Sequence, residues 1–185
     1  MSTHYCDYAP HDPVHAAYHE TEYGWPESDE SRLFERLVLE INQAGLNWGL
    51  MLKKREGFRN AFDNYDIDRI AKYGDADRNR LLNDEGIIRN RLKVNAAIHN
   101  AQVVRSFRDS HGGFAAWIDA HHPLTKSEWV KLFKKTFKFT GGEITGEFLM
   151  SIGYLPGTHR KDCPVYANIA KLQPAWMNPG LKFYS

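Results

Sequence analysis

The 185-residue chain has little of what marks secreted, membrane or fibrous proteins. It contains two cysteines, too few for a disulfide framework, and its start, MSTHYCDYAP, has neither the basic nor the apolar region of a signal peptide. Its least polar stretch, residues 44–52, is far shorter than the roughly 20 residues of a membrane helix. We therefore expect a cytoplasmic protein that crosses no membrane.

An excess of charge of either sign is also missing. The 24 Lys and Arg residues nearly balance the 23 Asp and Glu residues, so the net charge is +1 with the nine histidines neutral. This balance provides no overall attraction to nucleic acid, and any polyanion site must be local. The proportions of apolar and charged residues, 42% and 25%, are typical of a globular protein, and no repeat or linker interrupts the chain. We expect a single domain over residues 1–185 and a monomer.

Helical spacing of apolar residues recurs along the chain, whereas no useful stretch alternates like a β-strand. The first helix is expected to begin at Ser28 or Asp29 and to end at Gly45. Asn47 is a suitable N-cap for a second helix from Trp48, which predicts a helical hairpin with residues 45–47 at its tip. The sequence further predicts helices over 66–73, 75–83, 88–108, 114–120, 127–136 and 143–152, a second hairpin over 137–142, and an irregular tail over 174–180.

Candidate metal ligands lie near both ends of the chain. Cys6 and His19 are near the start, and His159 and Cys163 are separated by three residues near the end. Two thiolates and two imidazoles suit tetrahedral zinc if the two chain ends meet. The spacing alone is also compatible with two ordinary cytosolic cysteines and unrelated histidines.

Glu40 stands in an apolar stretch and shares a helical face with Leu33, Leu37 and Ala44. Such a carboxylate is either solvated at the edge of the helix or buried, and a buried one needs hydrogen-bond donors or has a raised pKa. Trp48 follows just past the bend, so the carboxylate and the indole can face one cavity. That combination suits a flat, electron-poor ring.

Two further groups of residues have both a structural and a functional interpretation. Five aromatic residues crowd the N-terminal segment, where most are expected to pack together and one or two to line a pocket. Basic residues flank the two hairpins and are either solvated or placed to contact a nucleic-acid backbone beside exposed N–H groups. The aromatic group is Tyr5, Tyr8, Tyr18, Tyr23 and Trp25, and the basic residues lie within 53–59, 89–93 and 131–138.

In their order along the chain, these features resemble the DNA-3-methyladenine glycosylase I family, a branch of the helix-hairpin-helix DNA glycosylases. The resemblance runs from Cys6 to about Cys163 and leaves residues 164–185 as a tail without a family feature. It rests on Asp12-Pro13, Ala17-Tyr18-His19, Gly24 and the runs 39–48, 52–56, 86–93 and 137–141.

The resemblance implies an all-α, two-lobed fold that flips alkylated purines, chiefly 3-methyladenine, out of damaged double-stranded DNA. It implies hydrolysis of the N-glycosidic bond, with the group that activates water left open. It also implies a structural Zn²⁺ that joins the two ends of the chain. The ligand positions of the family are occupied here by Cys6, His19, His159 and Cys163.

The resemblance also implies roles for residues near the two hairpins. Glu40 falls on the carboxylate that recognises the base, and Tyr18 and Trp48 fall on aromatic residues that pack around it. Tyr8 and Tyr23 are expected as further pocket walls. We expect the DNA contacts to come from Gly45, Leu46, Lys138, Thr140 and Gly141.

Four positions depart from the family pattern. Tyr8 and Tyr23 stand where Trp is usual, His15 stands where Tyr is usual, and Glu20 stands where Asp is usual. Tyrosine keeps a stacking face and adds a hydroxyl, so the lesion preference is open. The altered aromatic residues motivate a second hypothesis, a protein of the same fold that recognises damaged bases without excising them. A third is a zinc-stabilised helical protein without a nucleic-acid role.

Overall fold

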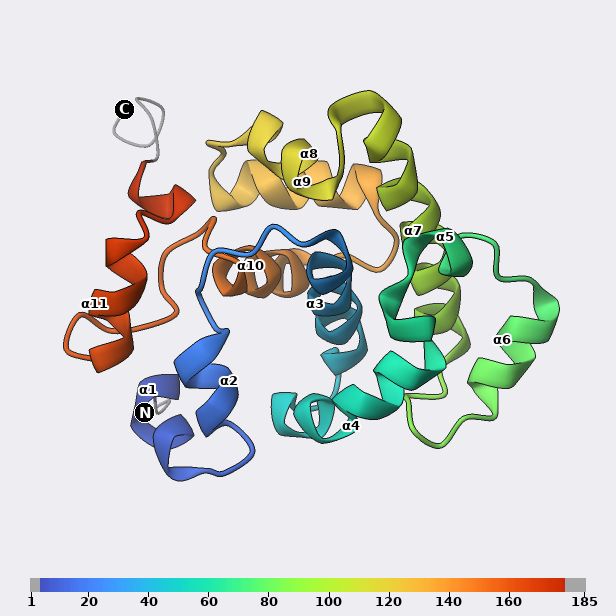
Figure 1. Cartoon of the computed structure of the whole chain (residues 1–185), viewed down its shortest axis with the longest axis horizontal. Helices are drawn as coiled ribbons and strands as arrows, with labels where there is room; N and C mark the ends of the chain where they lie inside the picture. The colour runs from blue at the N-terminus through green and yellow to red at the C-terminus, as the bar shows by residue number, and fades with distance from the viewer. Residues whose placement is uncertain (1–3, 179–185) are drawn as a thin grey trace.

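The structure, a computed structural model, describes residues 4–178, and within this range the chain forms helices and no strand (Figure 1). The all-helical prediction is therefore confirmed. None of these helices combines the length and the hydrophobicity of a membrane span. The elements are α1 (Tyr5–Tyr8), α2 (Ala16–Thr21), α3 (Glu30–Gln43), α4 (Trp48–Ala61), α5 (Ile67–Ile70), α6 (Asp75–Leu82), α7 (Arg91–His111), α8 (Phe114–His121), α9 (Lys126–Thr136), α10 (Gly142–Ser151) and α11 (Pro164–Lys171), with 3₁₀ turns at Ala9–His11, Asp63–Tyr65 and Ala175–Met177.

The first hairpin forms as the sequence predicts. The side chain of Asp29 caps α3 by accepting a hydrogen bond from the N–H of Arg32, and Asn47 caps α4 through the N–H of Leu50. Between the helices Gly45 adopts a φ of +79°, a conformation that disfavours side chains. The hairpin tip, residues 45–47, is exposed.

Helix α3 is the centre of the main hydrophobic core. Leu33, Phe34, Leu37 and Ile41 are almost completely buried, and residues of α4, α7, α8, α9 and α10 belong to the same core. Figure 1 shows α3 and α10 in the middle of the molecule, with the other helices around them. Because α3 is buried on nearly all sides, a polar side chain near its C-terminal end has little access to water.

A second, smaller core lies where the two chain ends meet. It contains Cys163, Val165 and Ile169, with Cys6 and Trp25 packed against it. Figure 1 shows the corresponding grouping, with α1 and α2 near α11 on one side of the molecule. The separation between these elements in the sequence makes this a long-range contact.

Helix α7 positions both hairpins. The ammonium group of the buried Lys93 donates hydrogen bonds to the carbonyl oxygens of Asn42 and Ala44, at 2.7 Å each, at the end of α3. About two turns further along, the side chain of Asn100 bonds both the N–H and the C=O of Lys138 in the second hairpin. The relative placement of the two hairpins is therefore fixed by hydrogen bonds to one helix.

Some boundaries differ from the sequence-based expectation. Helix α7 begins at Arg91 rather than 88, since Asn90 caps it, and extends to His111 before Gly112 at a φ of +90°. The helix expected over 66–73 ends at Ile70, because the N–H groups of Lys72 and Tyr73 bond three residues back and tighten the chain into turns.

The tail after Cys163 contains a helix that the sequence did not predict. Residues 164–171 form α11, which begins with Pro164 at the first helical position, where its missing N–H costs nothing. Its apolar face packs into the smaller core. Residues 175–177 form a 3₁₀ turn, and the end of the irregular segment expected over 174–180 lies outside the described residues.

Candidate functional site

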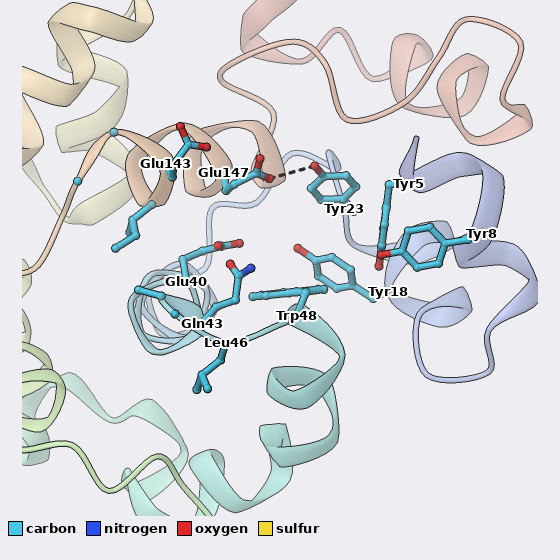
Figure 2. A pocket seen from close by; sticks show the side chains of 15 residues that line it. Tyr5, Tyr8, Tyr18, Tyr23, Glu40, Gln43, Leu46, Trp48, Glu143 and Glu147 are labelled. Carbon is cyan, nitrogen blue, oxygen red and sulfur yellow. Dashed lines mark hydrogen bonds between the residues drawn. The ribbon is translucent and has the colours of Figure 1, made fainter. Parts of the chain in front are cut away.

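A cavity of about 640 Å³ lies between the N-terminal segment, the first hairpin and the start of α10 (Figure 2). It brings together the five residues expected to surround a base, namely Glu40, Tyr8, Tyr18, Tyr23 and Trp48. It also includes Gly45, Leu46 and Gly141, which were expected to contact DNA, together with residues to which sequence reasoning gave no role. The further lining residues are Tyr5, Gln43, Ala44, Gly45, Leu46, Gly141, Gly142, Glu143, Ile144 and Glu147.

Aromatic rings form one wall of this cavity. The ring centroid of Tyr18 lies 5.1 Å from that of Trp48 and 5.6 Å from that of Tyr23, and Tyr5 meets Tyr23 edge-on at 5.2 Å. Tyr8 is 42% exposed and lies beside Tyr5, at the outer end of the row in Figure 2. A row of this kind offers ring faces and edges to a flat ligand.

Two polar atoms of these rings are buried without a partner. Neither the hydroxyl of Tyr18 nor the indole N–H of Trp48 makes a hydrogen bond in the described part of the chain. An unsatisfied buried group costs about 1–3 kcal/mol. In Figure 2 the Tyr18 hydroxyl points toward Glu40. Both atoms are available to a molecule that enters the cavity.

The carboxyl of Glu40 is also buried without a hydrogen-bond partner in the described part of the chain. Its residue is 4% exposed, and among residues 4–178 it has no hydrogen bond or ion pair. Burial, and next the nearby Glu147, hold the pKa of Glu40 well above its ordinary value, while the charge of Arg36 acts in the opposite direction. The sequence left open whether the Glu40 carboxylate is solvated or buried, and in the structure it is buried.

Arg36 does not neutralise Glu40 because other groups occupy its guanidinium. It bonds Glu22 at 3.2 Å and the carbonyl oxygen of Ser151 at 3.0 Å. Glu22 in turn accepts two hydrogen bonds of 2.6 Å from Arg55, which also bonds Glu35. This partly buried network connects Glu22, directly after α2, to α3 and α4.

The four predicted metal ligands converge at the meeting point of the chain ends. The ligand atoms of Cys6, His19, His159 and Cys163 all lie within 4.8 Å of one another. The Nδ1 atom of His159 is 3.6 Å from each sulfur, and the Nε2 atom of His19 is 3.8 Å from the sulfur of Cys163.

These separations fit a tetrahedral zinc ion. Bond lengths of about 2.3 Å to sulfur and 2.0–2.1 Å to nitrogen place ligand atoms roughly 3.6 Å apart at tetrahedral angles. The other ring nitrogen of His159 lies 2.7 Å from the carbonyl oxygen of Tyr23, the kind of contact that orients metal-binding histidines. Tyr23 is a cavity residue, so the cluster adjoins the pocket wall.

The residues expected to contact DNA have different settings. Gly45 and Leu46 are exposed beside the cavity, Leu46 at 44%, and Lys138 is exposed in the second hairpin. Thr140 is buried, and its hydroxyl donates to the carbonyl oxygens of Phe133 and Phe137. That hydroxyl is therefore engaged within the protein, and Thr140 shapes the hairpin from inside.

Glu147 is the main cavity residue that sequence reasoning missed. It lies in α10 and accepts a 3.1 Å hydrogen bond from the hydroxyl of Tyr23. A signal was present, because a carboxylate four residues after Glu143, in the helix following the second hairpin, interrupts an otherwise apolar segment. His15 is also engaged near this wall, with its Nδ1 atom 2.9 Å from the hydroxyl of Tyr5.

The state of Glu40 predicts a pH-dependent effect of Glu40→Gln on stability. The folded chain retains a proton on Glu40 at pH values where the unfolded chain has lost it, so the penalty is absent below the ordinary pKa of 4.5 and grows as the pH rises. Thermal unfolding should show Glu40→Gln to be more stable by about 1–3 kcal/mol at about pH 8 and unchanged at about pH 4. The exposed Glu56→Gln is the control, and a destabilised Glu40→Gln at the higher pH would contradict this assignment.

Comparison with known proteins places this fold and cavity in a family. The methyladenine glycosylase family matches residues 8–131. DNA-3-methyladenine glycosylase 1 of Escherichia coli and DNA-3-methyladenine glycosylase of Haemophilus influenzae are each 34% identical, over 87% and 86% of this chain and 96% of theirs. The structure of a 3-methyladenine DNA glycosylase I variant in complex with 3-methyladenine superposes with a TM-score of 0.79 at 28% identity, over 86% of this chain and 96% of that one. The chain belongs to the methyladenine glycosylase family.

Proposed function

We propose that this chain is a DNA repair enzyme that flips alkylated purines, chiefly 3-methyladenine, out of duplex DNA and hydrolyses their N-glycosidic bond. The observation that carries the proposal is the set of unpartnered buried polar groups in one aromatic cavity, namely the Glu40 carboxyl, the Tyr18 hydroxyl and the Trp48 N–H. Each is costly without a ligand, and together they suit the edge and face of a purine. The names of the relatives support the same activity.

The chemistry of the lesion matches this cavity. A base must leave the helical stack before an enzyme can reach its glycosidic bond, and a damaged base costs less to extrude. Methylation at a ring nitrogen gives the base in DNA a positive charge, which a carboxyl group and electron-rich ring faces favour over neutral adenine. Glu40 is proposed to recognise that base, with Tyr18 and Trp48 against its faces and Tyr8 and Tyr23 as outer walls.

The positive charge also determines what the protein must contribute to bond cleavage. A cationic base is a good leaving group, and the sugar passes through an oxocarbenium-like state before water adds. The enzyme then acts mainly by binding and orienting the base. Asp162, the nearest candidate for an aspartate acting on the sugar, is largely exposed and pairs with Arg160, which does not favour that role.

The two hairpins are proposed as the DNA-binding elements of a helix-hairpin-helix enzyme. Leu46 is apolar and exposed at the tip beside the cavity, which suits filling the space that a flipped base leaves. The exposed Lys138 and the backbone N–H groups at Gly141, where α10 begins, suit a phosphate. Thr140 and Gly45 contribute through the shape of the turns.

Release of free base from methylated duplex DNA tests the proposed function. We expect the wild-type chain to release 3-methyladenine, identified by chromatography, and Glu40→Gln to release it at least about a hundredfold more slowly, because a charged partner of the base is lost. Leu46→Ala should slow release from duplex DNA more than release from single-stranded DNA, since only the duplex leaves a gap to fill.

The outcomes of this experiment separate the alternatives. Equal release by wild type and Glu40→Gln removes Glu40 from its proposed role. Tight binding of methylated DNA without any release favours recognition without excision. A chain that neither binds methylated DNA nor releases a base from it would favour the third hypothesis, a zinc-stabilised helical protein without a nucleic-acid role.

We further infer that Cys6, His19, His159 and Cys163 hold a structural Zn²⁺. The distances among their ligand atoms support this inference, as does the burial of His19, His159 and Cys163 where α1, α2 and the start of α11 meet. Bound zinc would connect residues from both ends of the chain and hold the Tyr23 side of the cavity. Such a closed site with four protein ligands supplies stability rather than a reactive water.

Removal of the metal is expected to destabilise the protein. Elemental analysis should find about one zinc per chain, and chelation should lower the melting temperature by at least about 5 °C, with recovery when zinc is restored. Cys163→Ser should unfold at the temperature of the chelated wild type and respond little to added zinc. The inference would be overturned by purified protein that contains no zinc and whose melting temperature changes neither on chelation nor on addition of zinc.

A further inference from the structure

The cavity contains a second carboxyl group that faces the first. Glu147 in α10 and Glu40 in α3 both line it, and Figure 2 shows their carboxyls directed toward the same space between Tyr23 and Tyr18. Glu147 is half-buried, and its Oε2 atom accepts the 3.1 Å hydrogen bond from Tyr23. A flat ligand that contacts Glu40 therefore also lies near Glu147.

The surroundings of the two carboxyls are unequal. Two carboxylates that face one cavity repel each other, which favours a proton on one of them. The Tyr23 hydroxyl donates to Glu147 and favours its ionised form, whereas Glu40 has no donor among residues 4–178. The asymmetry assigns the proton to Glu40.

The other charged groups around the pair do not reverse this order. From α3, Arg36 favours ionisation of Glu40, but its guanidinium is held by Glu22 and Ser151. Burial raises the pKa of Glu147, as does Glu143 one turn earlier in α10, while Lys126 from α9 and the Tyr23 hydrogen bond lower it. The pKa values of Tyr18 and Tyr23 are raised by burial, so both hydroxyls remain neutral donors.

We propose that Glu147 is a second specificity-determining residue of this pocket, which in the free protein carries the single negative charge of the pair while Glu40 carries a proton that a cationic purine displaces. The proton passes to bulk water as the cation binds, so two carboxylates then surround one positive ring. The inference rests on the proposed function, whose base-binding site it specifies. The selectivity between a charged and a neutral purine is then set by both carboxyls together.

A pair of small purines tests this directly. The ring of 3,9-dimethyladeninium carries a fixed positive charge like that of the lesion in DNA, and 9-methyladenine is its neutral counterpart. Calorimetry in buffers of different ionisation enthalpy should show the full chain releasing about one proton per bound cation and none for the neutral purine. Affinity for the cation should therefore rise as the pH increases.

Two isosteric variants separate the roles of the carboxyls. Glu147→Gln should lower the preference for the cation over the neutral purine about tenfold to a hundredfold, and should reduce the proton release, because Glu40 alone ionises more readily. Glu40→Gln should abolish the proton release while keeping part of the preference. Tyr23→Phe, which removes the donor to Glu147, should lower the preference less than Glu147→Gln. Asp109→Asn, an equal loss of charge on exposed α7 surface, should match wild type.

The result that overturns the inference is a Glu147→Gln protein with wild-type proton release and wild-type preference for the cation. If that protein is unstable, Tyr23→Phe decides in the same way. Base release from methylated DNA, measured with the same preparations, tests the proposed function independently of this inference. Release that depends on Glu40 but not on Glu147 would retain that function and dismiss only the second carboxyl.

Discussion

A buried helix that carries an acid is the constraint on which this structure depends. Helix α3 packs into the core with almost its whole circumference, so Glu40 is held away from bulk water near the end of that helix. The nearby cation that could neutralise it, the buried Arg36, is already bonded to Glu22 and Ser151. A carboxyl in such a setting lowers stability in the free protein, and it is best explained by a ligand that compensates it.

The rest of the structure fixes the position of that carboxyl relative to the other walls of the cavity. Lys93 and Asn100 of α7 bond the ends of both hairpins, which connects the cavity walls from α3 and α10 through one helix. On the other side, the Cys2His2 cluster lies directly behind Tyr23, whose carbonyl oxygen contacts His159. Precise placement of a binding site by rigid elements is what recognition of a single modified base requires.

Sequence reasoning reached the helical class, the first hairpin and the residues of the aromatic wall, because caps, apolar spacing and family motifs are local signals. Asn47 and Gly45, for example, identify their turn from chemistry alone. It missed α11, whose apolar face is short and is explained only by the second core. It missed Glu147, because an acid within α10 is visible in the sequence but the packing that brings it to the cavity beside Glu40 is not.

Glu40 lowers the stability of the free protein until a base compensates it, and thermal unfolding with and without free 3-methyladenine measures this effect. At about pH 8, where the penalty is present, Glu40→Gln should unfold at a higher temperature than wild type without the base. Saturating base should raise the wild-type midpoint more than that of the variant, and so reduce or reverse the difference. Equal increases in both proteins would contradict the account, because the carboxyl would then have no part in holding the base.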